Sequence, residues 1–467
     1  MVPGAPLRAT GTILIVALSG FLMGFDGSLF TGAVIFIKAK FALSNFEMGW
    51  AVTSHTLTAT LSIVAAGPLA DRFGRRTVLR AAAVVFAVSA AVAAAASNFG
   101  ELIVARLLSG LGVGAVLVAA PMYIAEIAPP AVRGRMVTFN QLFIVTGIFL
   151  AFSSNYTIVK LEDLGAGWLA ALDLEQSNWR WMLGIGVVPA VVYLFALLFV
   201  PESPRWHAMH GRIDAARRIL TRAHGETFAE AELVEVRASI ERGAGKSDAT
   251  LRDLLVPQLR GVLVIGLLVG ILQQITGINS VFAYATVIFE RAAGAGDVDD
   301  AAFMQTMLVG FVNLVSTVIA LLLIDRVGRR PLLLYGTAGI ALSLVLTAYG
   351  FSANDGAMNS GLVLAGLLGF VGCFAFSLGP GMWVLFSEIF PNRVRGLAIS
   401  CVGFVNSSVC VVVQFMFPWQ MATQGGTRTF LLYALFAGVG FVLLVKMLPE
   451  TRGRSLEELE ESLVRKS

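Results

Sequence analysis

Twelve long apolar segments run along this chain of 467 residues, and they constrain its fold more than any other feature. Each holds about 20 mainly apolar residues, the length that an α-helix needs to cross the hydrocarbon core of a bilayer. Charged residues make up only 14 % of the chain, against about 25 % in typical soluble proteins. The segments cover residues 11–33, 47–69, 79–97, 102–125, 137–158, 181–200, 261–289, 304–324, 331–350, 361–387, 396–418 and 427–448. The sequence therefore predicts an all-α membrane protein with 12 transmembrane helices, and it excludes a water-soluble enzyme, a disordered tail and a nucleic-acid-binding protein.

One long polar stretch, residues 203–258, divides the spans into two sets of six. Its apolar spacing predicts short amphipathic helices, for example over Ile213–His224 and Phe228–Glu241. The first apolar segment has no clear cleavage site and is too long for a signal-peptide core, so we expect it to be retained as a helix. The predicted organisation is an N-terminal six-helix bundle over 1–202, a helical connector over 203–258, a C-terminal six-helix bundle over 259–449 and a tail over 450–467.

The basic residues predict the orientation. Of the 34 lysines and arginines, 27 fall before, between or after the spans on the side that includes the connector and both termini. Six fall on the other side: Lys38, Lys40, Lys160, Arg180, Arg291 and Arg428. Short cytoplasmic loops are enriched in Lys and Arg, and the bias remains 17 against six when the connector is left out. We therefore expect both termini in the cytoplasm. The compact termini and the absence of long loops favour a multi-pass protein of a bacterial inner (cytoplasmic) membrane.

Three motifs occur twice in the same order. The paired segments are Asp71–Arg76 with Asp325–Arg330, Glu126–Gly134 with Glu388–Gly396, and Pro201–Arg205 with Pro449–Arg452. The members of the pairs are 254, 262 and 248 residues apart, so the two sets of six helices are parallel repeats. Paired repeats of this kind build transporters that bind substrate near the membrane midplane, between halves that rock.

Two charged residues stand inside apolar spans. Asp26 is the only acidic residue deep in a span, and Arg106 lies several residues into the fourth span. Charges inside a membrane are costly and face a partner or a cavity. One hypothesis makes Asp26 a proton-binding site with Arg106 as its counter-ion, so that a change in their separation couples protons to substrate. The alternative is a fixed ion pair that holds two helices together.

The repeated motifs place further charges at the cytoplasmic ends of the helices. A carboxylate beside a helix end can bind arginines of neighbouring loops through paired hydrogen bonds, which would latch the two halves together during gating. The alternative is a set of charges that fixes the topology, and both readings can hold together. The residues concerned are Asp71, Arg75, Arg76, Glu126, Arg133, Glu202, Asp325, Arg329, Arg330, Glu388, Arg395 and Glu450.

Uncharged polar residues gather in the spans of the second half. Gln273, Gln274 and Asn279 lie on either side of Gly277, where we expect the helix to break. Further polar or aromatic positions are Tyr284, Asn313, Trp383 and Asn406 in this half and Gln141 in the first half. Amides donate and accept hydrogen bonds, as a polyhydroxylated ligand requires, and an indole offers a flat face to C–H groups. The set favours a binding cavity, although each amide alone could be an interhelical hydrogen bond.

No pattern of a catalytic triad, metal site or nucleotide site is present. The three histidines of the connector lack ligand spacing, and Ala244–Ser247 lacks the first glycine of a phosphate-binding loop. We therefore expect no enzyme activity, no cofactor and no nucleic-acid partner. The expected partners are a small sugar or polyol, protons and the lipid bilayer, with the monomer as the functional unit.

Over nearly its full length the chain resembles the sugar porter family of the major facilitator superfamily. The matching segments are Gly24–Asp26, Asp71–Arg76, Arg106, Pro121–Glu126, Arg133–Gly134, Gln141, Pro201–Arg205, Gln273–Gln274, Gly277–Asn279, Asn313, Asp325–Arg330, Gly379–Trp383, Ser387–Glu388, Arg395–Gly396 and Pro449–Thr451. The resemblance implies two six-helix bundles, four or five intracellular helices from connector and tail, and alternating access.

The resemblance also implies residue roles. It assigns sugar contacts to Gln141, Gln273, Gln274, Asn279, Asn313, Trp383 and Asn406, and an outer gate to Tyr284. Asp26 and Arg106 match the pair that distinguishes proton symporters from facilitators. Three positions depart from the family pattern: Ser407 replaces a tryptophan, Cys410 an asparagine and Ala283 a gate tyrosine. These departures leave a pentose, a polyol, a modified sugar or a disaccharide open beside an ordinary hexose.

The sequence thus predicts proton-coupled import of a sugar or sugar-like polyol. An uncoupled sugar facilitator is the main alternative. A transporter-like sugar sensor is disfavoured because only about 18 residues follow Pro449. A drug/proton exporter of the same superfamily would be expected to have a more apolar pocket.

Overall fold

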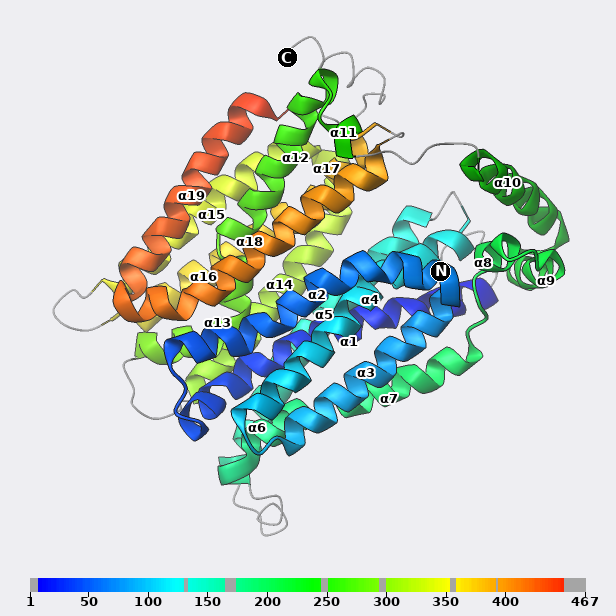
Figure 1. Cartoon of the computed structure of the whole chain (residues 1–467). Coiled ribbons are helices and arrows are strands. Elements are labelled where there is room, and N and C mark those ends of the chain that lie inside the picture. The colour runs from blue at the N-terminus through cyan, green and yellow to red at the C-terminus, as the bar shows by residue number, and fades with distance from the viewer. Residues whose placement is uncertain are drawn as a thin grey trace. The chain divides into compact units, whose positions relative to one another are not determined.

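The structure is a computed structural model that describes residues 7–129, 133–163, 174–244, 251–293, 300–352, 358–391 and 394–448. Within these ranges the regular elements are helices (Figure 1). Their bounds are α1 Leu7–Lys40, α2 Asn45–Phe73, α3 Arg75–Ala95, α4 Phe99–Ile127, α5 Arg133–Asp163, α6 Leu174–Gly184, α7 Val187–Ala196, the 3₁₀ helix η2 Leu197–Phe199, α8 Pro204–Met209, α9 Ile213–His224, α10 Glu226–Ala244, α11 Leu251–Leu254, α12 Pro257–Ile275, α13 Ile278–Ala293, α14 Asp300–Val327, α15 Arg329–Phe351, α16 Ser360–Phe376, α17 Leu378–Ile389, α18 Arg395–Thr423 and α19 Gly425–Met447. The predicted tail, 450–467, lies outside the described residues.

Eleven membrane-length apolar segments occur in the described part of the chain. Three of them join consecutive helices: α6 with α7 and η2, α12 with α13, and α16 with α17. The remaining predicted span is α2, which is 29 residues long and carries hydroxyl side chains and His55 in its middle turns. These polar groups make α2 less apolar than the other spans without shortening it.

The chain forms two compact units that do not follow chain order. Unit 1 contains Met1–Leu29, Leu57–Ala151 and Arg180–Asp248. Unit 2 contains Phe30–Thr56, Phe152–Trp179 and Ala249–Ser467. Helices α1, α2, α5 and α6 therefore each begin in one unit and end in the other. The predicted division into bundles over 1–202 and 259–449 stays a prediction.

Small residues bring α1 and α5 into backbone contact in unit 1. A Cβ atom at Gly24 would overlap the backbone oxygen of Ile144, and one at Gly147 would overlap that of Phe21. Close helix crossings of this kind rely on glycine because helices in lipid are held together mainly by packing. This crossing holds the α1 turn with Asp26 against α5.

The helix break predicted at Gly277 is confirmed. Helix α12 ends at Ile275, and Gly277 adopts a φ of +84° before α13 begins at Ile278. A side chain at this position would also meet the Tyr433 ring, with a Cβ only 2.6 Å from it. Both the backbone angle and the packing therefore require glycine.

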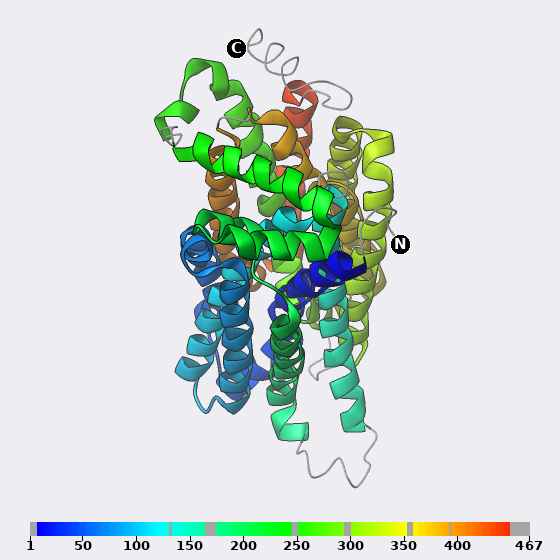
Figure 2. The ribbon, with the colours of Figure 1, turned by 90° about the vertical axis from the view of Figure 1, so that its right-hand side faces the viewer.

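The connector folds into short helices that pack on one another (Figure 2). Helix α9 has the predicted bounds, whereas α10 extends beyond the predicted Phe228–Glu241 at both ends. A small apolar cluster holds α8, α9 and α10 together: Ala208, Ala216, Leu220, Ala229 and Leu233. The amphipathic pattern predicted for this stretch is thus used for packing within the connector.

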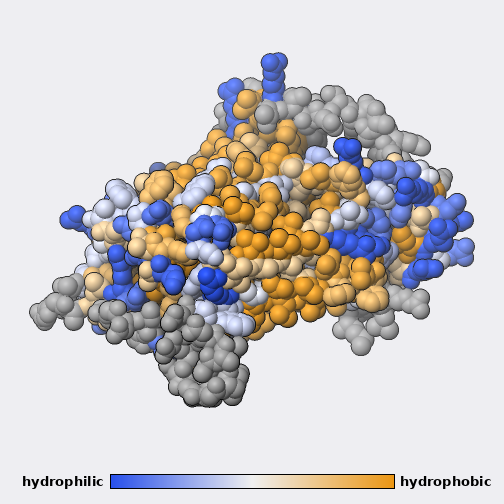
Figure 3. Space-filling model, turned by 60° about the horizontal axis from the view of Figure 1, so that its bottom comes forward, coloured by the Kyte–Doolittle hydropathy of each residue, from blue (hydrophilic) through white to orange (hydrophobic). Residues whose placement is uncertain are grey.

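Large apolar side chains cover much of the surface. On α7 and η2 they recur at helical spacing, at Val188, Val192, Phe195 and Phe199, and each is at least 60 % exposed. Figure 3 shows hydrophobic residues spread widely over one face of the molecule. An exposed apolar stripe on a spanning helix faces lipid rather than water.

Candidate functional site

A buried ion pair stands in unit 1 at the end of the helices where the connector begins, which we call the connector end. The Arg75 Nη2 atom lies 2.9 Å from Oε1 of Glu126 and 2.7 Å from Oδ1 of Asp71. Ser203 donates a hydrogen bond to Oε2 of the same Glu126. Arg75 is the first residue of α3, and Glu126 stands in the last turn of α4. The first copy of the repeated motifs therefore builds one charged cluster.

Glu202 completes this cluster by capping α3. Its Oε1 atom accepts hydrogen bonds from the backbone N–H groups of Arg76 and Ser203, both at 2.9 Å. A helix N-terminus carries unpaired N–H groups and partial positive charge, so a carboxylate is favourable there. Gly74 leaves space for this carboxylate, since a Cβ atom at that position would overlap it. Gly74 also has a φ of +98°, which residues with a side chain rarely adopt.

The second copy of the motifs builds the same pair in unit 2. Arg329 Nη2 lies 2.9 Å from Oε1 of Glu388, and Gly328 before it has a φ of +97°. Arg330 donates to the Val445 oxygen and Arg395 to the Phe390 oxygen. These bonds hold helices within one unit, so the proposed latch between the halves stays a prediction. The side chains of Arg133, Asp325 and Glu450 lie outside the described residues.

Asp26 lies in unit 1 with hydrogen-bonding and charged neighbours. Ser109 of α4 donates a hydrogen bond to its Oδ2 atom, and the Arg106 guanidinium interacts with it electrostatically. Arg106 is buried, with 6 % exposed, whereas Asp26 is half-buried. The structure therefore brings together the two residues that the sequence singled out. It adds Ser109, which the sequence could have indicated because a residue three positions after Arg106 lies on the same face of the helix.

Four amide side chains form a hydrogen-bonded cluster in unit 2. Gln274 Nε2 donates to Oδ1 of Asn406 at 3.1 Å, and Asn406 Nδ2 donates to Oε1 of Gln273 at 2.7 Å. Asn279 Nδ2 donates to Oε1 of Gln274 at 2.6 Å. These residues come from α12, α13 and α18, so the predicted polar set is brought together here. Each bond joins a donor and an acceptor that a hydroxyl-rich ligand could take over.

The other predicted sugar-contacting residues, Asn313, Trp383 and Gln141, are not among the four amides of this cluster. Asn313 is buried in α14, with 5 % exposed. Trp383 of α17 is 45 % exposed and packs edge-on against Phe386. Gln141 belongs to unit 1 and is half-buried, one residue after buried Asn140. The Oδ1 atom of Asn140 is buried without a hydrogen-bond partner.

Tyr284 stands at a kink inside α13. Its φ of −122° and ψ of 19° depart from helical values, and its side chain is fully buried. The hydroxyl lies 3.3 Å from the Gln414 oxygen and 3.5 Å from the Met48 oxygen. Its ring stacks on Phe417 with centroids 5.2 Å apart. Tyr284 thus joins α13 to α2 and α18, and its role in an outer gate stays a prediction.

Two threonines that the sequence reasoning missed support the same kink. Thr31 of α1 donates to the Phe282 oxygen at 3.0 Å, and Thr286 donates to the Thr31 oxygen. Kinked helices expose carbonyls that side chains of a neighbour can satisfy. Hydroxyl residues are common in apolar spans, so no sequence pattern marked these two.

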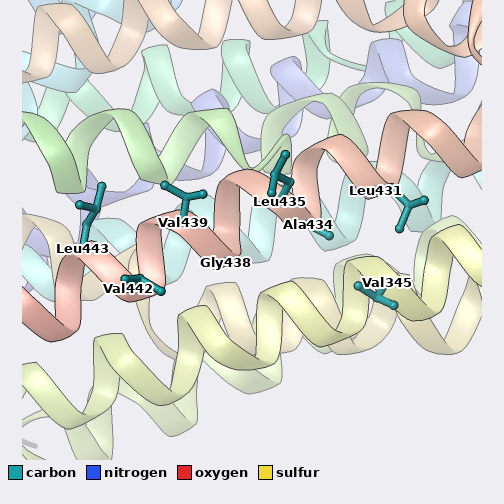
Figure 4. Close-up of a pocket in the computed structure, with 8 residues that line it drawn as sticks. All are labelled: Val345, Leu431, Ala434, Leu435, Gly438, Val439, Val442 and Leu443. Carbon is teal, nitrogen blue, oxygen red and sulfur yellow. The ribbon is translucent and has the colours of Figure 1, made fainter.

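An apolar groove of about 580 Å³ lies on unit 2 between α15 and α19 (Figure 4). It is lined by Val345, Leu431, Ala434, Leu435, Gly438, Val439, Val442 and Leu443. None of these side chains can hydrogen-bond to a sugar, so the groove is not the predicted binding site. Among the described residues, no group of three or more His, Cys, Asp or Glu side chains could hold a metal ion.

Comparison with known proteins identifies relatives over the whole length. A family model described as "Sugar (and other) transporter" matches residues 12–463. The arabinose-proton symporter of Bacillus subtilis is 36 % identical over 98 % of this chain and 97 % of its own. The D-xylose-proton symporter of Escherichia coli is 32 % identical over 96 % of this chain and 94 % of its own. The solved xylose transporter XylE from E. coli, partially occluded and inward open, matches with a TM-score of 0.81 and 30 % identity, covering 97 % of this chain and 100 % of that one.

Proposed function

Since this chain belongs to the sugar (and other) transporter family, we propose that it imports a sugar or a sugar-like polyol together with protons. It is a transport protein rather than an enzyme, and its all-α major facilitator fold agrees with the prediction from the sequence.

The observation that carries the proton-coupling proposal is the position of Asp26. An ionisable side chain inside a spanning helix is costly, so such residues have partners and commonly mark a proton or substrate pathway. Here Asp26 has Ser109 as a hydrogen-bond donor and Arg106 as a nearby cation. These two groups favour the charged carboxylate, and a conformational change that withdrew them would favour proton binding.

The proposed sugar site is built on the amide cluster of unit 2. Gln273, Gln274, Asn279 and Asn406 would exchange their mutual hydrogen bonds for bonds to sugar hydroxyl groups, so that no buried amide is left unpaired. Trp383 would stack on the apolar face of the ring, and Asn313 would add a further amide. Gln141, in unit 1, stays a predicted sugar contact. A pentose is the leading candidate, because two relatives are named for arabinose and xylose.

The proposed orientation places the connector end in the cytoplasm. Its support is the excess of arginine and lysine on that side. The end with the turn between α1 and α2 would then face outward, in a bacterial inner membrane. We call it the outer end below, and we take the monomer as the transport unit.

Uptake into proteoliposomes tests this function. Purified protein would be reconstituted, an inwardly directed proton gradient imposed, and accumulation of labelled arabinose, xylose, glucose and a polyol measured. We expect accumulation above the outside concentration for at least one sugar, and its loss in Asp26→Asn while exchange of sugar for sugar continues. Unchanged accumulation in Asp26→Asn would contradict the coupling role, and exchange without accumulation in the wild type would favour an uncoupled facilitator.

A further inference from the structure

Helix α18 presents a polar stripe towards α12 and α13. Asn406, Cys410 and Gln414 recur every four residues and are all buried. Asn406 belongs to the amide cluster, and Cys410 contacts Asn279. Gln414 continues the stripe towards the outer end and has no role in the proposed sugar site. A buried amide in an apolar span is costly unless its hydrogen bonds are made.

Gln414 joins three helices through both ends of its amide. Thr56 of α2 donates to its Oε1 atom at 2.8 Å, and its Nε2 atom donates to the Asn279 oxygen at 3.2 Å. Its own backbone oxygen accepts the Tyr284 hydroxyl. One residue therefore connects α2 with the first turn and the kink of α13.

Hydroxyl side chains of α2 bond to α18 at Thr56 and to α4 from Thr58 onwards. Thr56, the last residue of α2 in unit 2, bonds to α18. Two residues later Thr58 donates to the Leu107 oxygen of α4, and Ser62 donates to the Leu111 oxygen of the same helix. Both of these bonds lie in unit 1. Hence the Thr56–Gln414 bond lies where α2 passes from one unit to the other.

We propose that Gln414 is a positioning residue of the outer gate, which keeps α2 and the kinked α13 together while the outer end is closed. This inference rests on the proposed transport function and adds a residue to its gating. Opening the outer end separates Thr56 from Gln414 and leaves the buried Oε1 atom without its donor, so the bond favours the closed arrangement. A hydrogen bond between spanning helices is worth on average about a factor of three in an equilibrium constant. Loss of the Thr56–Gln414 bond should therefore change the equilibrium between the closed and the open outer end by about threefold.

Half-saturation constants for sugar exchange, measured at both faces of the membrane, test the proposal. The apparent affinity at each face scales with the fraction of protein open to it. Thr56→Val and Gln414→Met should each raise the ratio of the inner to the outer constant by about threefold, with the outer constant falling. Because both variants remove the same bond, the double variant should resemble the singles rather than multiply their effects. A variant that is only partly misfolded would have a lower exchange rate, or higher half-saturation constants at both faces, with an unchanged ratio of the two constants.

Two further variants serve as controls. Thr56→Ser keeps the hydroxyl donor and should retain the wild-type ratio. Thr423→Val removes a hydroxyl of α18 that bonds only within its own helix, to the Trp419 oxygen at 2.8 Å, and should also leave the ratio unchanged. Unchanged ratios in both test variants, or multiplied effects in the double variant, would overturn the proposal. A wild-type protein that exchanges no sugar would contradict the transport function instead.

Discussion

The Arg75 guanidinium and the Glu126 carboxylate form an ion pair of 2.9 Å in which only 2 % and 7 % of the two side chains are exposed. Arg329 and Glu388 form a pair of the same length in the other repeat, with 13 % and 27 % exposed. The two repeats thus present one interaction at two degrees of burial. Burial decides what an ion pair contributes, because a buried charge without its partner is far more costly than an exposed one.

We expect Glu126→Ala to lower the free energy of unfolding by up to about 3 kcal/mol, because the buried Arg75 would keep only the half-exposed Asp71 as a charged partner. Glu388→Ala should cost less, since Arg329 is more exposed and can be reached by water. Thermal unfolding in detergent, followed by the loss of helical circular dichroism, would compare the two variants.

The exposed pair of Lys160 and Asp300 provides the reference for this comparison, with 44 % and 30 % of its side chains exposed. Lys160→Ala should change the free energy of unfolding by no more than about 1 kcal/mol. Equal losses for all three variants would show that burial does not set the ranking.

Gly74→Ala should destabilise the turn between α2 and α3 in two ways. A φ of +98° with a ψ of 149° is a backbone conformation used almost only by glycine, at a cost of about 1–3 kcal/mol for another residue, and the added methyl group would displace the Glu202 carboxylate from the end of α3. Gly225→Ala is the matched control, since Gly225 has a similar backbone conformation, with a φ of +91° and a ψ of 168°, and open space around it. The midpoint of thermal unfolding should fall further for Gly74→Ala, and equal falls would contradict a role for the Glu202 contact.

Sugar binding should depend on the amide cluster. Any sugar that binds the folded protein raises its melting temperature by mass action, so a screen over sugars and polyols at high concentration would find the best ligand. Gln274→Ala and Trp383→Ala should abolish that stabilisation. Ser408→Ala, which removes a hydroxyl bonded within α18, should retain it. Retention of the full shift in Gln274→Ala and Trp383→Ala would contradict the proposed pocket.

The connector should lose stability in mild acid because of His207. Burial, with the nearby Arg212, His210 and Arg218, lowers the pKa of His207 from its ordinary value of 6.5, although Glu202 opposes the shift. Its Nδ1 atom is buried without a hydrogen-bond partner. Because the unfolded chain then binds a proton more readily than the folded one, this stabilisation is present above pH 6.5 and is lost as the pH falls through the folded pKa.

Trypsin cleavage of the connector between about pH 7.5 and pH 5.5 would measure this effect. Cleavage of the wild type should rise more steeply on acidification than that of His207→Gln, after correction for the protease's own pH dependence. His210→Gln, at an exposed position of the same helix end, serves as the control. An identical pH dependence in wild type and His207→Gln would contradict the role of His207.

Much of the fold could be predicted from local patterns. Apolar segments long enough to cross a bilayer predicted the spanning helices, and the amphipathic stretch Ile213–His224 forms α9 with those bounds. Gly277 marked the break before α13 because few other residues adopt its backbone angle. These features depend on the length, composition and backbone freedom of one segment, all of which are visible in the chain.

The partners of individual polar residues were less predictable. Asp26 and Arg106 were singled out because charges are rare in apolar spans, but Ser109, Thr31 and Gln414 resemble many other hydroxyl and amide residues in such helices. Gln414 could have been noticed as the third polar residue at intervals of four after Asn406. Its bond to Thr56, 358 residues away, depends on which helices lie side by side.

The sequence by itself determined that this chain is a membrane protein of twelve apolar spans in two repeats, with a charge pair inside the first. Hydropathy, charge position and internal repetition are properties of the chain alone. Only the tertiary structure decided that Arg75 pairs with Glu126, that four amides share one hydrogen-bonded cluster, and that α2 changes partner between Thr56 and Thr58. Such contacts depend on how the helices cross and rotate, and many helix packings satisfy the same apolar pattern.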